Sequence, residues 1–130
     1  MNVKLLRKVA KHILAEPTRL VMGNWLLKKG YEDIEAIEYG EFGSRPFPKC
    51  GTAGCIAGWT CELSGKGKVK HHDLVAKRLL GLNKRESERL FLPDQWPAEF
   101  ERGYNDDGRK KTAEVAVARI EHFIKTKGKE

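Results

Sequence analysis

The feature that most constrains this chain is a run of twelve residues, Cys50–Cys61, without a single charged side chain. Because 33% of all residues are charged, such a run has no stable place on the surface and is expected in the core. Thr52 is a candidate N-cap, so the run predicts a buried central helix at about residues 53–64. Gly54 and Gly58 lie four residues apart and leave one side of that helix small, which predicts that another backbone approaches closely there.

Amphipathic patterns on both sides of this run predict further helices. Apolar residues recur at three- and four-residue steps, and prolines, glycines and cap residues separate the segments. No two-residue alternation is sustained. The sequence therefore predicts one all-α domain over residues 1–130, with five or six helices and an irregular acidic loop at about residues 31–49. The other segments expected to be helical are 2–15, one or two turns within 24–30, 73–82, 83–92, 98–104 and a last helix capped by Thr112.

Charge is distributed unevenly along the chain. The 25 basic and 18 acidic residues give a net charge of +7, but residues 1–30 carry +6 and residues 66–89 carry +5, whereas residues 31–43 carry −5. Basic helix faces attract nucleic acids or acidic proteins. The leading hypothesis is a non-enzymatic interaction domain that binds an acidic macromolecule or a host protein through such faces. A solvated surface of mixed charge is the competing interpretation.

Residues 71–91 resemble a helix-turn-helix DNA-binding unit, with Ala76 in the first helix and Gly81 near the turn. The spacing of these two residues is five, whereas the motif usually has four, and Glu86 and Glu88 would face phosphates. Two core helices joined by a short turn are therefore the alternative. If the unit binds an acidic partner, the expected contacts are its basic side chains, Lys77, Arg78, Lys84, Arg85 and Arg89.

Cys55 suggests a second class of function, a cysteine-dependent enzyme. Near the start of a helix the dipole and free amides favour a thiolate, and His71 or His72 could serve as the base. The stretch resembles the cysteine-bearing helix of papain-like enzymes, except that Lys49 and Cys50 stand where those enzymes carry a glutamine. A buried, inert cysteine is the opposing interpretation, because its neighbours are apolar.

The same helix start offers two other kinds of site. Thr52, Gly54 and Cys55 could form a pocket in which a nucleotide-like small molecule approaches the helix amides. A metal site is not expected, because Cys55 and Cys61 are six residues apart and diverge by about 240° around a helix. We predict neither a metal nor another cofactor.

The chain also carries signals about its compartment. No segment approaches the ~20 apolar residues of a membrane span, and charges interrupt the apolar pattern of residues 1–17 where a signal peptide needs a continuous block. The three cysteines, an odd number, favour free thiols. We expect a cytoplasmic protein without a membrane partner.

Several short motifs resemble a group of small bacterial and phage proteins of unassigned activity. The most specific is CGT-x-x-CIAGW at residues 50–59. It is accompanied by ILAEP at residues 13–17, by Met22 and Trp25, by a Trp-Pro pair and by a closing AVARIEHFI segment. The resemblance covers most of the chain and implies a small helical domain. It supplies no catalytic residues.

Overall fold

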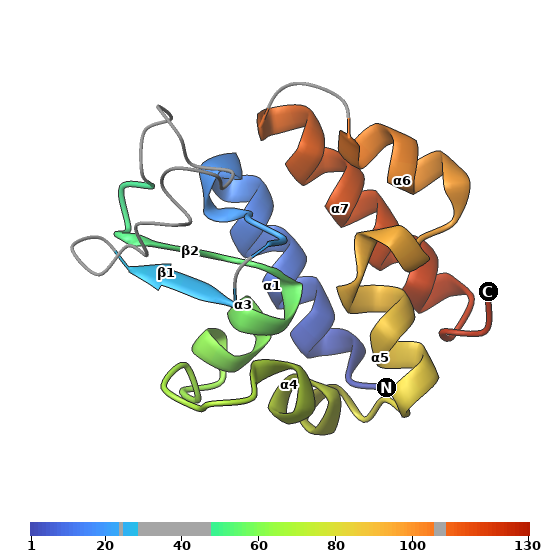
Figure 1. Cartoon of the computed structure of the whole chain (residues 1–130), viewed down its shortest axis with the longest axis horizontal. Coiled ribbons are helices and arrows are strands. Elements are labelled where there is room, and N and C mark those ends of the chain that lie inside the picture. The colour runs from blue at the N-terminus through green and yellow to red at the C-terminus, as the bar shows by residue number, and fades with distance from the viewer. Residues whose placement is uncertain (24, 29–47, 106–108) are drawn as a thin grey trace.

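The computed structural model describes residues 1–23, 25–28, 48–105 and 109–130. Six α-helices dominate these residues and confirm the all-α prediction (Figure 1). The acidic loop expected at residues 31–49 lies outside them, except for Pro48 and Lys49. The helices are α1 (Val3–Ala15), α3 (Ile56–Leu63), α4 (His72–Leu80), α5 (Lys84–Phe91), α6 (Ala98–Asn105) and α7 (Arg109–Lys125), with short 3₁₀ helices η1 (Pro17–Arg19) and η2 (Pro93–Gln95).

Two short strands lie before α3. Strand β1 (Leu26–Lys28) pairs antiparallel with β2 (Thr52–Gly54), so that Leu26 lies opposite Gly54 and Lys28 opposite Thr52. The helical turns expected within residues 24–30 are therefore wrong for residues 26–28. The predicted N-cap is also wrong, because Thr52 is part of β2 and Cys55 caps the helix that begins at Ile56. Pairing between segments far apart in sequence overrides the local preference in both places.

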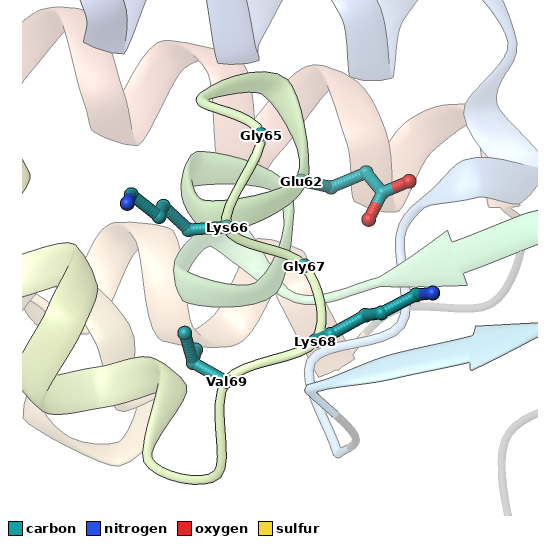
Figure 2. A pocket seen from close by; sticks show the side chains of 6 residues that line it. All are labelled: Glu62, Gly65, Lys66, Gly67, Lys68 and Val69. Atoms are coloured by element: carbon teal, nitrogen blue, oxygen red, sulfur yellow. The ribbon is translucent and has the colours of Figure 1, made fainter.

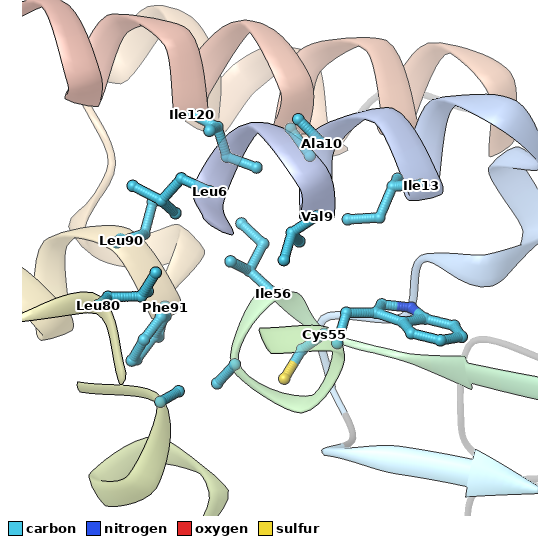
Figure 3. Packing of buried hydrophobic residues seen from close by; sticks show 14 of the residues in the cluster. Leu6, Val9, Ala10, Ile13, Cys55, Ile56, Leu80, Leu90, Phe91 and Ile120 are labelled. Atoms are coloured by element: carbon cyan, nitrogen blue, oxygen red, sulfur yellow. The ribbon is translucent and has the colours of Figure 1, made fainter. Parts of the chain in front are cut away.

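Helix α3 lies in the core, as predicted, although it is shorter than residues 53–64. The expected burial of the whole uncharged run is wrong at its start, where Cys50 is exposed and Thr52 is half-buried in β2. All residues from Ile56 to Cys61 are buried. Helix α1 lies between α3 and α7 (Figure 1), and Figure 3 shows Ile56 directed toward α1. The buried apolar side chains around α3 include Leu6, Val9, Ala10 and Ile13 of α1, Leu80 of α4, Leu90 and Phe91 of α5, and Ile120 and Phe123 of α7.

The backbone of Trp25 packs against the small side of α3. A Cβ atom added to Gly54 or Gly58 would overlap the carbonyl oxygen of Trp25. The same oxygen accepts a hydrogen bond from the Cys55 amide at 3.3 Å. The close approach of a backbone that the glycine spacing predicts is thus confirmed, and the approaching segment is the one that enters β1.

Of the two cap residues that the sequence offers for the later helices, Asn83 is confirmed and Thr112 is wrong. Asn83 caps α5, since its side-chain oxygen accepts a hydrogen bond from the Glu86 amide at 2.9 Å. Gly81, in the left-handed conformation with φ of 68°, ends α4. Thr112 is not a cap, because α7 begins three residues earlier, at Arg109.

Helix α7 carries one charged side chain into the core. Arg119 is fully buried, and its guanidinium lies 5.5 Å from the centroid of the Phe123 ring. It forms an ion pair with Glu130 and donates a hydrogen bond of 2.9 Å to the Arg89 carbonyl oxygen. Burial lowers the pKa of Arg119, while the Glu130 carboxylate opposes the shift. These contacts tie the residues after α7 to α5.

Replacing Gly58 with alanine tests the contact between Trp25 and α3. In an ordinary helix interior this change stabilises by about 1 kcal/mol. Here the added methyl group meets a backbone oxygen that cannot turn away, so we expect a loss of about 1–3 kcal/mol or more. Chemical denaturation of both proteins measures the difference, and a stabilised Gly58→Ala variant would contradict the contact.

Candidate functional site

Cys55 is a buried helix cap. Its side chain is 2% exposed, and its sulfur accepts a hydrogen bond from the Gly58 amide at 3.3 Å. The thiol is also placed to donate a weak hydrogen bond to the Trp25 carbonyl oxygen at 3.9 Å. Burial raises the pKa of Cys55 to about 11, although the backbone amides at the helix start oppose the shift. A thiol with this pKa is protonated at neutral pH and is a poor nucleophile.

The two histidines proposed as bases have other environments. His72 is 8% exposed, its Nε2 donates a hydrogen bond of 2.9 Å to the Gly67 carbonyl oxygen, and its ring stacks on Trp25. His71 is exposed at the N-terminal end of α4. In the described part of the chain the Cys55 thiol bonds only to Gly58 and Trp25, so these residues do not assemble a pair of nucleophile and base.

The pocket expected at Thr52, Gly54 and Cys55 is occupied by the protein itself. Trp25 covers the glycine side where a ligand would approach the helix amides. Thr52 lies in β2, three residues before the helix cap. Among the residues that the structure describes, no group of three or more histidine, cysteine or acidic side chains is arranged to hold a metal ion.

The basic residues of α4 and α5 do not form one available set. Arg78 and Arg85 are exposed and Lys77 is half-buried. Lys84 is exposed but lies 4.0 Å from the Glu88 carboxylate. Arg89 donates a hydrogen bond of 3.0 Å to the Gly128 carbonyl oxygen and so contributes to the packing of the C-terminal residues. Arg89, one of the side chains expected to contact an acidic partner in the helix-turn-helix interpretation, is thus used by the fold itself.

Helix α1 presents a more uniform basic face. Lys4, Arg7, Lys8 and Lys11 are all exposed, and the opposite side of the helix is buried. Arg7 lies 3.6 Å from Glu121, a surface ion pair that holds the guanidinium only weakly. These side chains are part of the +6 charge of residues 1–30, but the sequence does not mark α1 as a site, since any amphipathic surface helix shows a similar pattern.

Among the hollows of the described surface, three differ in the chemistry of their lining. One of about 430 Å³ follows α3 and is lined by Glu62 and Lys66, among others, but Figure 2 shows Lys66 and Lys68 pointing away from one another. A second, of about 440 Å³, is mainly apolar and includes Trp25 and Leu92. The third, of about 270 Å³, brings together basic side chains, with lining residues Lys8, Lys11, His12, Ala15, Arg19 and Leu63.

Comparison with known proteins gives no match. No family model, no curated protein and no solved structure is significantly similar to the chain. The resemblance based on CGT-x-x-CIAGW therefore stays a prediction. Among the described helices, none has both the length and the apolar character needed to cross a bilayer.

Alkylation of the native protein tests the position of the three thiols. Cys50 is exposed, whereas Cys55 and Cys61 are buried and burial raises the pKa of both to about 11. We expect iodoacetamide to modify Cys50 first and the other two only after a denaturant is added, as measured by peptide mass spectrometry. A Cys50→Ser control should take up almost no label while folded. Modification of Cys55 ahead of Cys50 would restore the nucleophile hypothesis.

Proposed function

We propose that this protein is a non-catalytic interaction domain that binds an acidic protein through the exposed basic face of α1. The observation that carries the proposal is the placement of Lys4, Arg7, Lys8 and Lys11 on one helix whose other side is fixed in the core. A rigid row of positive charges speeds the encounter with an acidic partner and orients it.

Because Cys55 is buried, the proposed function includes no cysteine-dependent reaction. The thiol is protonated, and its hydrogen bonds serve the start of α3. By contrast, the described residues make few contacts with the positive side chains of α1. Arg7 forms a weak ion pair with Glu121, and Lys8 donates a long hydrogen bond of 3.5 Å to the Leu63 carbonyl oxygen. Charge that the fold does not need is available to a partner.

An acidic protein suits this face better than a nucleic acid. Leu14 is 46% exposed and lies on α1 one turn after Lys11, so the basic row continues into an apolar contact that a protein surface can cover. On α5, the helix that would enter a DNA groove, Glu88 is exposed beside Lys84 and Arg89 is held by Gly128. A phosphate backbone would meet both signs of charge there.

Charge reversal on α1 tests the proposal, with poly-L-glutamate as the acidic probe and short duplex DNA as the competing class. We expect poly-L-glutamate to bind at low salt and more weakly as salt increases. The double variant Lys4→Glu/Arg7→Glu should weaken this binding about tenfold or more, because four units of charge change at the face. Fluorescence anisotropy of the labelled probes measures both effects.

A matched control distinguishes a specific face from general attraction. The variant Lys84→Glu/Arg85→Glu makes the same change of charge on α5 and should weaken binding much less. Equal losses in the two double variants would contradict the α1 face. Tighter binding to duplex DNA than to poly-L-glutamate, lost mainly in the α5 variant, would favour the nucleic-acid interpretation instead.

A further inference from the structure

The cavity of about 270 Å³ lies between α1, η1 and the C-terminal end of α3. Lys8 and Lys11 line it from α1, Arg19 from η1, and Ala15 and Leu63 supply an apolar side. Positive side chains from two separate elements thus meet around one hollow. Charges of the same sign repel one another, so such an arrangement costs free energy unless an anion offsets it.

Arg19 is held in a fixed position in this cavity. Its side chain is 17% exposed, and its Nη1 donates a hydrogen bond of 2.8 Å to the His12 carbonyl oxygen. Its own carbonyl oxygen accepts a hydrogen bond of 2.8 Å from the Trp59 indole N–H. The Nε atom is buried without a hydrogen-bond partner. A guanidinium fixed in this way loses little entropy when it binds an anion.

Within the described residues, one carboxylate approaches this group of cations. Glu16 lies 3.9 Å from Arg19 and also accepts a hydrogen bond from the Lys49 amide at 2.5 Å. Its single negative charge is shared between these partners and does not balance Lys8, Lys11 and Arg19. Counted over the described residues alone, about two positive charges remain without compensation at the cavity.

His12 lies beside Arg19 and adds no positive charge to the cavity. Its Nδ1 lies 3.4 Å from Arg19 Nη1. A guanidinium can only donate, so Nδ1 is the acceptor and the hydrogen of the neutral ring is on Nε2, which is buried without a partner. Burial and the nearby charge of Arg19 lower the pKa of His12, although Glu16 opposes the shift. The ring packs edge-on against Trp59 with centroids 4.3 Å apart, which fixes its orientation.

We infer that this cavity binds the phosphate group of a small phosphate monoester. The two positive charges that the described carboxylates leave unbalanced match the dianion, and a fixed guanidinium flanked by two lysines is chemistry that phosphate oxygens favour. Ala15 and Leu63 would contact the organic substituent. The inference goes beyond the proposed function and does not rest on it, because the cavity is built from Arg19 of η1 and Leu63 of α3 as well as from two side chains of the α1 face, Lys8 and Lys11.

A titration with phenyl phosphate, followed by ¹⁵N NMR at constant ionic strength, tests the inference. We expect saturable shifts at the backbone amides of Lys11, His12 and Arg19 and at the Trp59 indole N–H, with a Kd of about 1 mM or tighter. Benzoate, which has a similar ring but one negative charge, should bind much more weakly. Equal affinity for benzoate, or no saturable shift with phenyl phosphate, would overturn the proposal.

Single substitutions at the cavity locate the site. Lys8→Gln and Lys11→Gln change exposed side chains and should leave the fold intact, yet each should weaken phenyl phosphate binding about fivefold or more. Lys84→Gln removes the same charge on α5 and should change the affinity little. An equal loss in the α5 control would show general attraction and overturn the inference. The Lys4→Glu/Arg7→Glu variant leaves every lining residue in place, so failure of the α1 face and failure of the cavity are distinguishable.

Discussion

The contact between the Trp25 carbonyl oxygen and the start of α3 organises the part of the structure around β1 and β2. Because Gly54 and Gly58 have no side chains, the backbone of Trp25 lies directly against them and bonds to the Cys55 amide. The Gly54 carbonyl oxygen also accepts a hydrogen bond from the Val21 amide at 2.9 Å, and Gly54 pairs with Leu26 where β2 lies beside β1. Three segments therefore meet at one glycine, and their buried backbone groups are satisfied by one another.

This arrangement explains why Cys55 is structural. The sulfur occupies the position of a cap, where it accepts the Gly58 amide hydrogen, and the approach of Trp25 covers the side on which a substrate would lie. Helix starts that bind anions or activate thiols keep their amides open to solvent. Here the Cys55 sulfur itself accepts the Gly58 amide hydrogen, and the backbone of Trp25 covers the helix start.

Trp59 connects the same core to the basic side of the protein. It is buried in α3, yet its indole N–H reaches the Arg19 carbonyl oxygen and its ring supports His12. The apolar side of α1 packs on the core while its lysines remain in water, so one helix both stabilises the fold and supplies the charge for the proposed functions. Arg19 and His12 are held in place at the cavity because both contact the buried Trp59.

Sequence by itself determined the helical class, the burial of residues 53–61 within the uncharged run, the cap at Asn83, and the need for a close backbone approach at Gly54 and Gly58. Each of these depends on residues within a few positions of one another, where periodicity and hydrogen bonding of side chain to backbone decide the outcome. Only the tertiary structure decided that β1 pairs with β2, that Trp25 covers α3, that Arg89 bonds to Gly128 and Arg119 is buried, and that Lys8, Lys11 and Arg19 share one cavity. These depend on contacts between distant segments, and the sequence pattern of a buried arginine or a cavity lysine is the same as that of a solvated one.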